Sequence, residues 1–134
     1  MIVVDASVLA PALSDDSDEG DHLRQRLHGQ RLTAPELIDL EVQSVLRFAV
    51  RRGLLDERRA RLALGDLASV PLHRASHRSL LSRAWELRDN LTTYDAAYVA
   101  LAEVLGASLL TADSKLANAP GIRCEVDLVQ MPPR

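Results

Sequence analysis

The chain has a single cysteine, Cys124, among its 134 residues, and this scarcity excludes two kinds of structure. One cysteine cannot form a disulfide within the chain, and it cannot supply the several thiolates of a structural zinc site. Cys124 stands beside the apolar stretch 126–129, so we interpret it as a small strand residue and not as a nucleophile.

Aromatic side chains and lysine are also scarce. Aromatic residues make up 3% of the sequence, so the core must consist mainly of Leu, Val, Ile and Ala, and few side chains can stack on bases. The formal net charge of −3 argues against a protein that holds nucleic acid by overall charge. Lys115 is the only lysine, and the other cations are arginines, whose planar guanidinium suits phosphate oxygens.

The sequence has no long hydrophobic run. The N-terminus lacks a basic segment followed by a long apolar one, and no apolar run approaches the length that spans a bilayer. We therefore expect a cytoplasmic protein that does not associate with membranes. A length of 134 residues and an apolar fraction of 47% predict one domain, 1–134, with a single core.

Short apolar runs alternate with helical segments along the whole chain. The runs predict strands at 2–5, 31–34, 69–72, 108–111 and 124–129. Such alternation predicts an α/β fold whose mostly parallel sheet, of roughly five strands, is covered by helices on both faces.

Two acidic residues follow buried strands in this scheme. Asp5 ends the first apolar run, and Asp113 follows the run 107–112. Both are therefore expected at the carboxyl edge of the sheet, where open α/β proteins bind ligands. Carboxylates gathered in one cleft raise one another's pKa, and this arrangement favours a hard divalent cation among them.

A third acid lies on a predicted helix, 36–50, with Pro35 suited to its first position. The apolar side chains on one face of this helix are Leu37, Val45 and Phe48. Glu41 shares that face, so an acid interrupts the apolar stripe. Glu41 is either a functional side chain or a residue at the margin of the stripe that pairs with Arg47.

A fourth acid, Asp95, lies near the start of a helix that ends at Gly106. Thr92 followed three residues later by Asp95 resembles a capping box, which is a purely structural interpretation. This capping role is compatible with a functional role in the cleft, because a carboxylate at a helix start after a strand-side loop also faces the cleft.

The segment 15–21 carries most of the remaining clustered acids. Its simplest interpretation is a solvated turn that caps a helix beginning near His22. The alternative is a source of additional metal ligands.

Taken together, these segments resemble the PIN-domain ribonucleases, and most closely the VapC toxins of bacterial type II toxin–antitoxin pairs. The segments that carry the resemblance are 2–9 (IVVDASVL), 34–35 (AP) with 41–42 (EV) and 45–46 (VL), 91–98 (LTTYDAAY) and 110–116 (LTADSKL). The resemblance spans nearly the whole chain and implies a PIN-like three-layer α/β/α sandwich.

The resemblance also implies a function. The family's acidic quartet would be Asp5, Glu41, Asp95 and Asp113, acting as catalytic residues and metal ligands. Ser7 and Thr111 would be the hydroxyls that orient carboxylates. Members cleave RNA endonucleolytically with Mg²⁺ or Mn²⁺, form homodimers, and are silenced by a cognate VapB-type antitoxin in a toxin–antitoxin hetero-oligomer. Candidate contacts to RNA phosphates are Arg47, Arg51, Arg83, Arg88 and Lys115.

Two other classes of α/β protein require an aspartate that this chain lacks. A phosphatase of the haloacid-dehalogenase type needs a second Asp two residues after Asp5, where this chain has Ser7. A receiver domain needs a phosphoacceptor Asp after the third strand, and 70–73 contains none. A catalytically inactive interaction module that binds a basic partner peptide stays open, as do the identity of the RNA and the number of metal ions.

Overall fold

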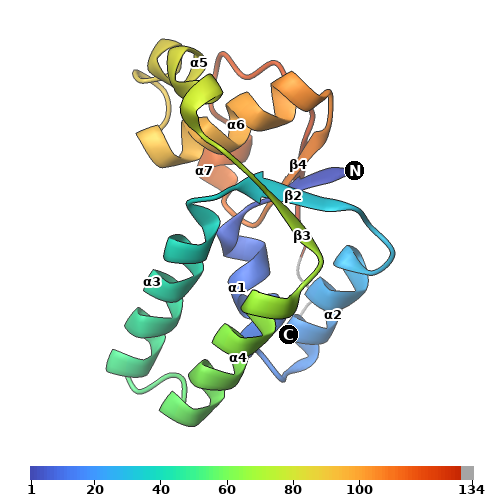
Figure 1. Cartoon of the computed structure of the whole chain (residues 1–134), viewed down its shortest axis with the longest axis vertical. Coiled ribbons are helices and arrows are strands. Elements are labelled where there is room, and N and C mark those ends of the chain that lie inside the picture. The colour runs from blue at the N-terminus through green and yellow to red at the C-terminus, as the bar shows by residue number, and fades with distance from the viewer. Residues whose placement is uncertain (131–134) are drawn as a thin grey trace.

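The computed structural model describes residues 1–130, and strands alternate with helices throughout (Figure 1). The strands are β1 (Ile2–Val4), β2 (Leu32–Pro35), β3 (Leu72–Ala75), β4 (Ser108–Thr111) and β5 (Val126–Leu128). They form one sheet in the order β3-β2-β1-β4-β5, and every neighbouring pair is parallel. The predicted parallel α/β sheet of five strands is therefore confirmed.

Helices cover both faces of this sheet. They are α1 (Ala6–Ser14), α2 (Asp18–Leu27), α3 (Ile38–Arg51), α4 (Glu57–Ser69), α5 (Leu81–Glu86), α6 (Thr93–Leu105) and α7 (Ser114–Ala117), with a 3-10 turn η1 (Arg78–Leu80). Helices α1 to α4 pack together on one side, and α5 and α6 lie on the other (Figure 1). No helix within residues 1–130 is long and apolar enough to cross a membrane.

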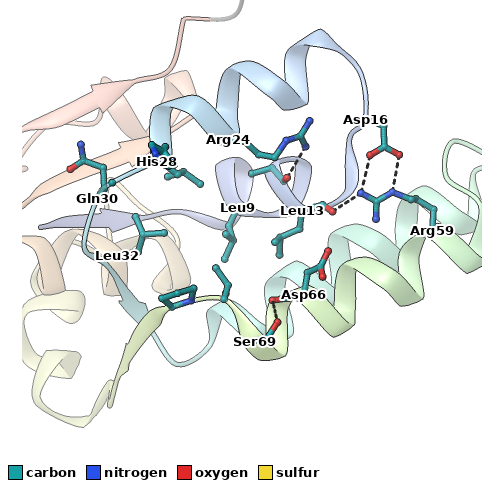
Figure 2. Close-up of a pocket in the computed structure, with 15 residues that line it drawn as sticks. Leu9, Leu13, Asp16, Arg24, His28, Gln30, Leu32, Arg59, Asp66 and Ser69 are labelled. Atoms are coloured by element: carbon teal, nitrogen blue, oxygen red, sulfur yellow. Dashed lines mark hydrogen bonds and ion pairs between the residues drawn. The ribbon is translucent and has the colours of Figure 1, made fainter.

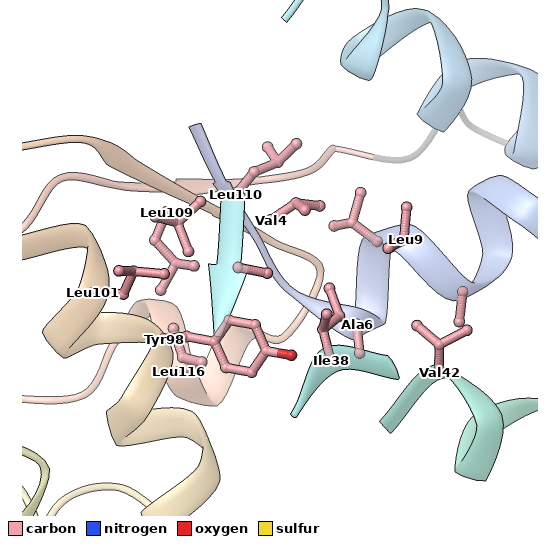
Figure 3. Close-up of a cluster of buried hydrophobic side chains, with 14 of the residues drawn as sticks. Val4, Ala6, Leu9, Ile38, Val42, Tyr98, Leu101, Leu109, Leu110 and Leu116 are labelled. Carbon is pink, nitrogen blue, oxygen red and sulfur yellow. The ribbon is translucent and has the colours of Figure 1, made fainter. Parts of the chain in front are cut away.

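The central strands β1 and β4 are buried on both faces. Val3, Val4, Leu109 and Leu110 are fully buried, and helices α1 and α6 pack against them from opposite sides (Figure 3). Strands covered on both faces have continuous apolar sequences, which is why these two were recognisable.

The strand order reverses between β1 and β4. The chain runs outward from β1 through β2 to β3, and then crosses back to β4 and β5 on the other side of β1. In open α/β sheets, ligands bind at the carboxyl ends of the strands at such a reversal. Asp5 directly follows β1, and Asp113 lies two residues after β4.

The observed boundaries differ from the predicted ones at β3 and at Pro35. Strand β3 begins at Leu72 and not at residue 69, because helix α4 continues through Ser69. Pro35 ends strand β2 and does not open the next helix, which begins at Ile38.

The buried face of α3 is also offset by one residue from the prediction. Its buried side chains are Ile38, Val42 and Leu46, spaced four residues apart. Val45 and Phe48, which were predicted to share the apolar stripe, are exposed. Glu41 therefore borders the buried face through its neighbour Val42.

The acidic segment 15–21 forms a turn and the first turn of a helix. Helix α2 begins at Asp18, earlier than predicted, with acidic side chains in its first turn, where the helix dipole favours them. Asp16 accepts hydrogen bonds from the guanidinium of Arg59 on α4, at 2.8 and 3.0 Å. This ion pair therefore connects the turn before α2 to α4.

Gly20, in the first turn of α2, is expected to be intolerant of substitution. A Cβ at this position would lie 1.8 Å from the backbone oxygen of Asp15. Because backbone must move to make room, Gly20→Ala should lower the free energy of unfolding by about 2–3 kcal/mol, as measured by urea denaturation.

Gly65 in α4 provides the matched control, since a Cβ there would meet open space. Gly65→Ala should raise the free energy of unfolding by about 0.5–1 kcal/mol, because alanine has the higher helix propensity. Equal unfolding midpoints for Gly20→Ala and the unsubstituted protein would contradict the packing described at Asp15.

Candidate active site

The four acids singled out from the sequence all lie at the starts of helices. Asp5 and Asp113 are the N-cap residues of α1 and α7, and Glu41 and Asp95 lie in the first turns of α3 and α6. A helix N-terminus carries partial positive charge, which favours nearby anions. Each carboxylate is thus held by its own helix at the carboxyl edge of the sheet.

Asp5 is the most enclosed of the four, with only 6% of its surface exposed. Its Oδ2 accepts hydrogen bonds from the hydroxyls of Ser7 and Thr111, both at 2.8 Å. Among the described residues, no donor reaches its Oδ1. One carboxylate oxygen is therefore fixed by protein hydroxyls, and the other is left for an external partner.

The two hydroxyls also link the ends of β1 and β4. The Ser7 Oγ accepts from the backbone N–H of Ala112 at 3.0 Å, and the Thr111 Oγ1 accepts from the backbone N–H of Asp113 at 3.0 Å. The orientation of Asp5 is consequently coupled to the backbone that carries Asp113.

Asp113 caps its own helix. Its Oδ1 accepts a hydrogen bond from the backbone N–H of Lys115 at 2.9 Å. This bond fixes the side-chain rotamer and occupies one of the two carboxylate oxygens.

Asp95 combines the two roles that the sequence suggested. The hydroxyl of Thr92 accepts a hydrogen bond from the Asp95 backbone N–H at 3.1 Å, which caps helix α6. Burial raises the pKa of the Asp95 carboxyl, and the negative charges of Asp5 and Asp113 raise it further, while the Thr92 hydroxyl lowers it. Asp95 therefore lies within the electrostatic reach of both other aspartates.

The Glu41 carboxyl is also affected by the charges of neighbouring aspartates. Burial raises the pKa of Glu41, the hydroxyl of Tyr98 partly lowers it, and the charges of Asp5 and Asp95 raise it again. Its Oε1 is buried without a hydrogen bond of standard geometry. Glu41 therefore joins the cluster, and no pairing with Arg47 is found within residues 1–130.

Tyr98 was not singled out from the sequence. It lies one turn after Asp95 on α6 and is fully buried, and its hydroxyl also lacks a hydrogen bond of standard geometry. The sequence feature that could have identified Tyr98 is a side chain with a polar tip, three residues after an acid, on an otherwise apolar helix face.

The carboxylates do not form a ready-made metal cage. Within residues 1–130, no group of three or more His, Cys, Asp or Glu side chains is arranged so that it could hold an ion. One oxygen each of Asp5 and Asp113 is occupied by hydrogen bonds, and like charges repel one another. Electrostatic interactions link Asp95 to Asp5 and Asp113, and Glu41 to Asp5 and Asp95. The role of these four acids as metal ligands stays a prediction.

Arg83 was predicted as a phosphate contact, and its surroundings argue against that role. Its guanidinium binds Glu103 at 2.7 Å and Glu86 at 3.1 Å, and also donates to the backbone oxygen of Gly121 at 2.8 Å. These bonds fasten α5 to α6, so the group is not free for RNA.

The other four predicted contacts are exposed: Arg47, Arg51, Arg88 and Lys115. Arg47 and Arg51 lie on α3, and Lys115 lies on α7 close to Asp113. Arg88 stacks on the ring of Trp85 at 4.6 Å.

A cavity of about 780 Å³ lies elsewhere, between α1, α2 and α4 (Figure 2). Its floor is apolar, with Leu9, Leu13 and Leu32 among its lining residues. Arg24 and Arg59 at its rim are bound to backbone oxygens and to Asp16. None of the four clustered carboxylates lines this cavity.

The raised pKa values predict how stability depends on pH without metal. In the folded protein Glu41 and Asp95 hold their protons to higher pH than their usual values of 4.5 and 3.8. In this pH range the folded state thus binds more protons than the unfolded state. The free energy of unfolding therefore falls as the pH rises from the usual pKa values of these two carboxyls through their raised pKa values in the folded protein. Thermal melting in EDTA should show a lower Tm at pH 7 than at pH 5.

Glu41→Gln removes one of these charges. Its metal-free Tm at pH 7 should exceed that of the unsubstituted protein, and it should fall less between pH 5 and 7. Glu125→Gln, at an exposed position, is the control and should leave the pH profile unchanged. A Glu41→Gln profile that matches the unsubstituted one would show that Glu41 titrates as an ordinary surface acid.

Comparisons with known proteins identify the family of this chain. The PIN domain family matches residues 2–122. Ribonuclease VapC1 of Mycobacterium tuberculosis is 43% identical over 129 residues, which are 96% of this chain and 97% of the relative. Ribonuclease VapC9 of the same species is 40% identical over 129 residues, covering 96% of this chain and 98% of the relative.

The fold is also found among solved structures. M. tuberculosis VapC20, described as a sarcin-ricin loop cleaving toxin, superposes with a TM-score of 0.66 at 17% identity, over 87% of this chain and 92% of that one. At such low identity the likeness concerns the fold alone. The sequence relatives carry the stronger conclusion: the chain belongs to the PIN-domain family, among its VapC members.

Proposed function

We propose that this protein is a metal-dependent endoribonuclease that acts as the toxin of a toxin–antitoxin pair. The observation that carries the proposal is the cluster of Asp5, Glu41, Asp95 and Asp113 where the strand order reverses. The sequence relatives at 40–43% identity are named ribonucleases, which supports RNA as the substrate. A single PIN domain that occupies the whole of 1–134 remains part of this proposal.

The donor atoms of the cluster fit Mg²⁺ or Mn²⁺. All are carboxylate oxygens, and the Asp5 Oδ1 lacks a hydrogen-bond donor among the described residues. Mg²⁺ keeps several waters and needs only one or two carboxylates, so a complete protein cage is not required. Asp5, Asp95 and Asp113 would hold the ion, and Glu41 would complete its surroundings.

When bound, the ion would lower the pKa of water and offset the negative charge that develops on the phosphate during hydrolysis. The protein's own contribution is orientation. Ser7 and Thr111 hold the Asp5 Oδ2 and leave the Oδ1 without a hydrogen bond among the described residues. Glu41 would orient the attacking water. The convergent helix N-termini favour the anionic phosphate.

RNA must also be held near these acids. Arg47, Arg51, Arg88 and Lys115 are exposed cations that would contact phosphates along the strand. Because these are few and the net charge is −3, we expect RNA binding to be weak without the metal ion and to weaken further as salt increases.

The same proposal includes protein partners. We propose a homodimer and a VapB-type antitoxin that binds it. Several large apolar side chains are exposed on α3 and α5: Leu40, Phe48, Leu81 and Trp85. Exposed apolar side chains of this kind favour protein–protein contact. Sedimentation equilibrium of the purified protein, alone and with the co-expressed antitoxin, would measure both assemblies.

The catalytic proposal is tested by incubating the purified protein with end-labelled RNA in Mg²⁺, in Mn²⁺ or in EDTA. We expect internal cleavage with either ion, none in EDTA, and recovery when the ion is added back. Cleavage that persists in EDTA would refute metal dependence. Failure to cleave any RNA of a total cellular pool with either ion would favour the inactive interaction module.

A further inference from the structure

The hydroxyl of Tyr98 is a buried polar group in an apolar setting. The Tyr98 side chain is fully buried, and its ring lies with Ile38, Leu101 and Leu116 in the core (Figure 3). Packing on this scale fixes the ring, because protein interiors leave little room for side chains to move. The position of the hydroxyl is therefore set by the fold.

The hydroxyl points away from α6 toward the starts of α1 and α3, where Ala6 and Ile38 lie (Figure 3). Glu41 is three residues after Ile38, on the next turn of α3. The ionisable groups that act on Tyr98 are Glu41 foremost, followed by Asp5 and Asp95. The hydroxyl thus borders the acidic cluster from its inner side.

Two buried polar atoms in this region lack hydrogen bonds of standard geometry, the Tyr98 hydroxyl and the Glu41 Oε1. One is a donor and the other an acceptor, and they act on one another electrostatically. A buried polar group is costly unless it finds a partner. A hydrogen bond from the Tyr98 hydroxyl to Glu41 would satisfy both atoms at once.

We propose that Tyr98 is a positioning residue, whose hydroxyl donates to the Glu41 carboxylate and holds its other oxygen toward the ion and the scissile phosphate. This inference rests on the proposed function. A phenol is protonated at neutral pH, so the hydroxyl is available as a donor. Tyr98 itself does not touch the reacting atoms.

Tyr98→Phe removes only the hydroxyl and keeps the ring in the core. We expect kcat for RNA cleavage to fall about 10-fold, with KM within about twofold, as is typical for groups that orient metal ligands. The rise in Tm that Mn²⁺ produces should be smaller than in the unsubstituted protein, because weaker binding stabilises the folded state less.

Glu41→Gln supplies the test of mechanism. If Tyr98 acts through Glu41, Tyr98→Phe should reduce kcat no further in a Glu41→Gln background. Thr33→Val is the matched control, because the Thr33 hydroxyl is also buried without a partner and lies in β2. Its kcat should equal that of the unsubstituted protein.

Three results would overturn the inference: an unchanged kcat in Tyr98→Phe, an equal loss in the Glu41→Gln background, or an equal loss in Thr33→Val. A protein that cleaves no RNA would refute the proposed function instead. In that case urea unfolding of Tyr98→Phe, Glu41→Gln and the double variant still decides whether the two side chains interact, since additive effects would exclude the contact.

Discussion

Asp5→Asn is expected to reduce RNA cleavage roughly a thousandfold, a loss of about 4 kcal/mol of transition-state stabilisation, and to leave the protein folded. Asparagine has nearly the same shape as aspartate, and its amide oxygen can still accept hydrogen bonds from Ser7 and Thr111. The substitution removes the negative charge of the most enclosed carboxylate, whose Oδ1 would otherwise face the ion. Initial rates on labelled RNA and the circular dichroism spectrum measure the two expectations.

Asp89→Asn is the matched control for that substitution. Asp89 is exposed and lies outside the carboxylate cluster. The Asp89→Asn variant should therefore cleave RNA at the same rate as the unsubstituted protein. Both variants are purified by the same procedure, and this excludes a contaminating nuclease. Full cleavage by Asp5→Asn would remove Asp5 from the mechanism.

Thr111→Val is expected to reduce cleavage about 10- to 100-fold, although Thr111 is not one of the four acids. The Thr111 hydroxyl donates to the Asp5 Oδ2 at 2.8 Å and accepts from the Asp113 backbone N–H at 3.0 Å. Valine keeps the shape but can do neither, so Asp5 would depend on Ser7 alone. The Asp113 N–H would lose its partner at the same time.

The rate should fall mainly through kcat, and the apparent affinity for Mn²⁺ measured by calorimetry should weaken. Thr33→Val again serves as control, because it replaces a buried strand threonine whose hydroxyl has no partner. A Thr111→Val rate within about threefold of the unsubstituted protein would mean that Ser7 alone orients Asp5.

The features that were predictable from sequence are those with a local signature. Strand β4 was predicted at its observed bounds, 108–111, because strands buried on both faces have unbroken apolar sequences. Asp5 and Asp113 could be placed at one edge of the sheet because parallel strands end on the same side. Thr92 was recognised as a helix cap from its spacing to Asp95.

The features that were not predictable depend on contacts between distant segments. Residues 37, 45 and 48 have helical spacing, and so do residues 38, 42 and 46, which are the buried ones. Only the packing of α3 against α1 and α4 decides between the two faces. Arg83 was predicted to contact phosphate, but it forms an ion pair with Glu103, which is twenty residues away in the sequence.

The arrangement of the four acids was also only partly predictable. The sequence predicted that the four carboxylates lie in one region of the fold. It did not predict which carboxylate oxygens accept hydrogen bonds from residues such as Ser7 and Thr111. The interaction of Glu41 with Tyr98 joins side chains from two different helices, α3 and α6. A spacing pattern along one helix contains no information about that contact.

In the proposed function, Asp5, Asp95 and Asp113 hold a divalent ion where the strand order reverses, and Glu41 completes its surroundings. Anomalous diffraction from crystals grown with Mn²⁺ is the sharpest test, because the signal locates manganese without reference to activity. A manganese peak in contact with Asp5 and bordered by Asp95 and Asp113 is the predicted result. A peak found only at the acidic segment 15–21, or none at saturating Mn²⁺, would contradict the account.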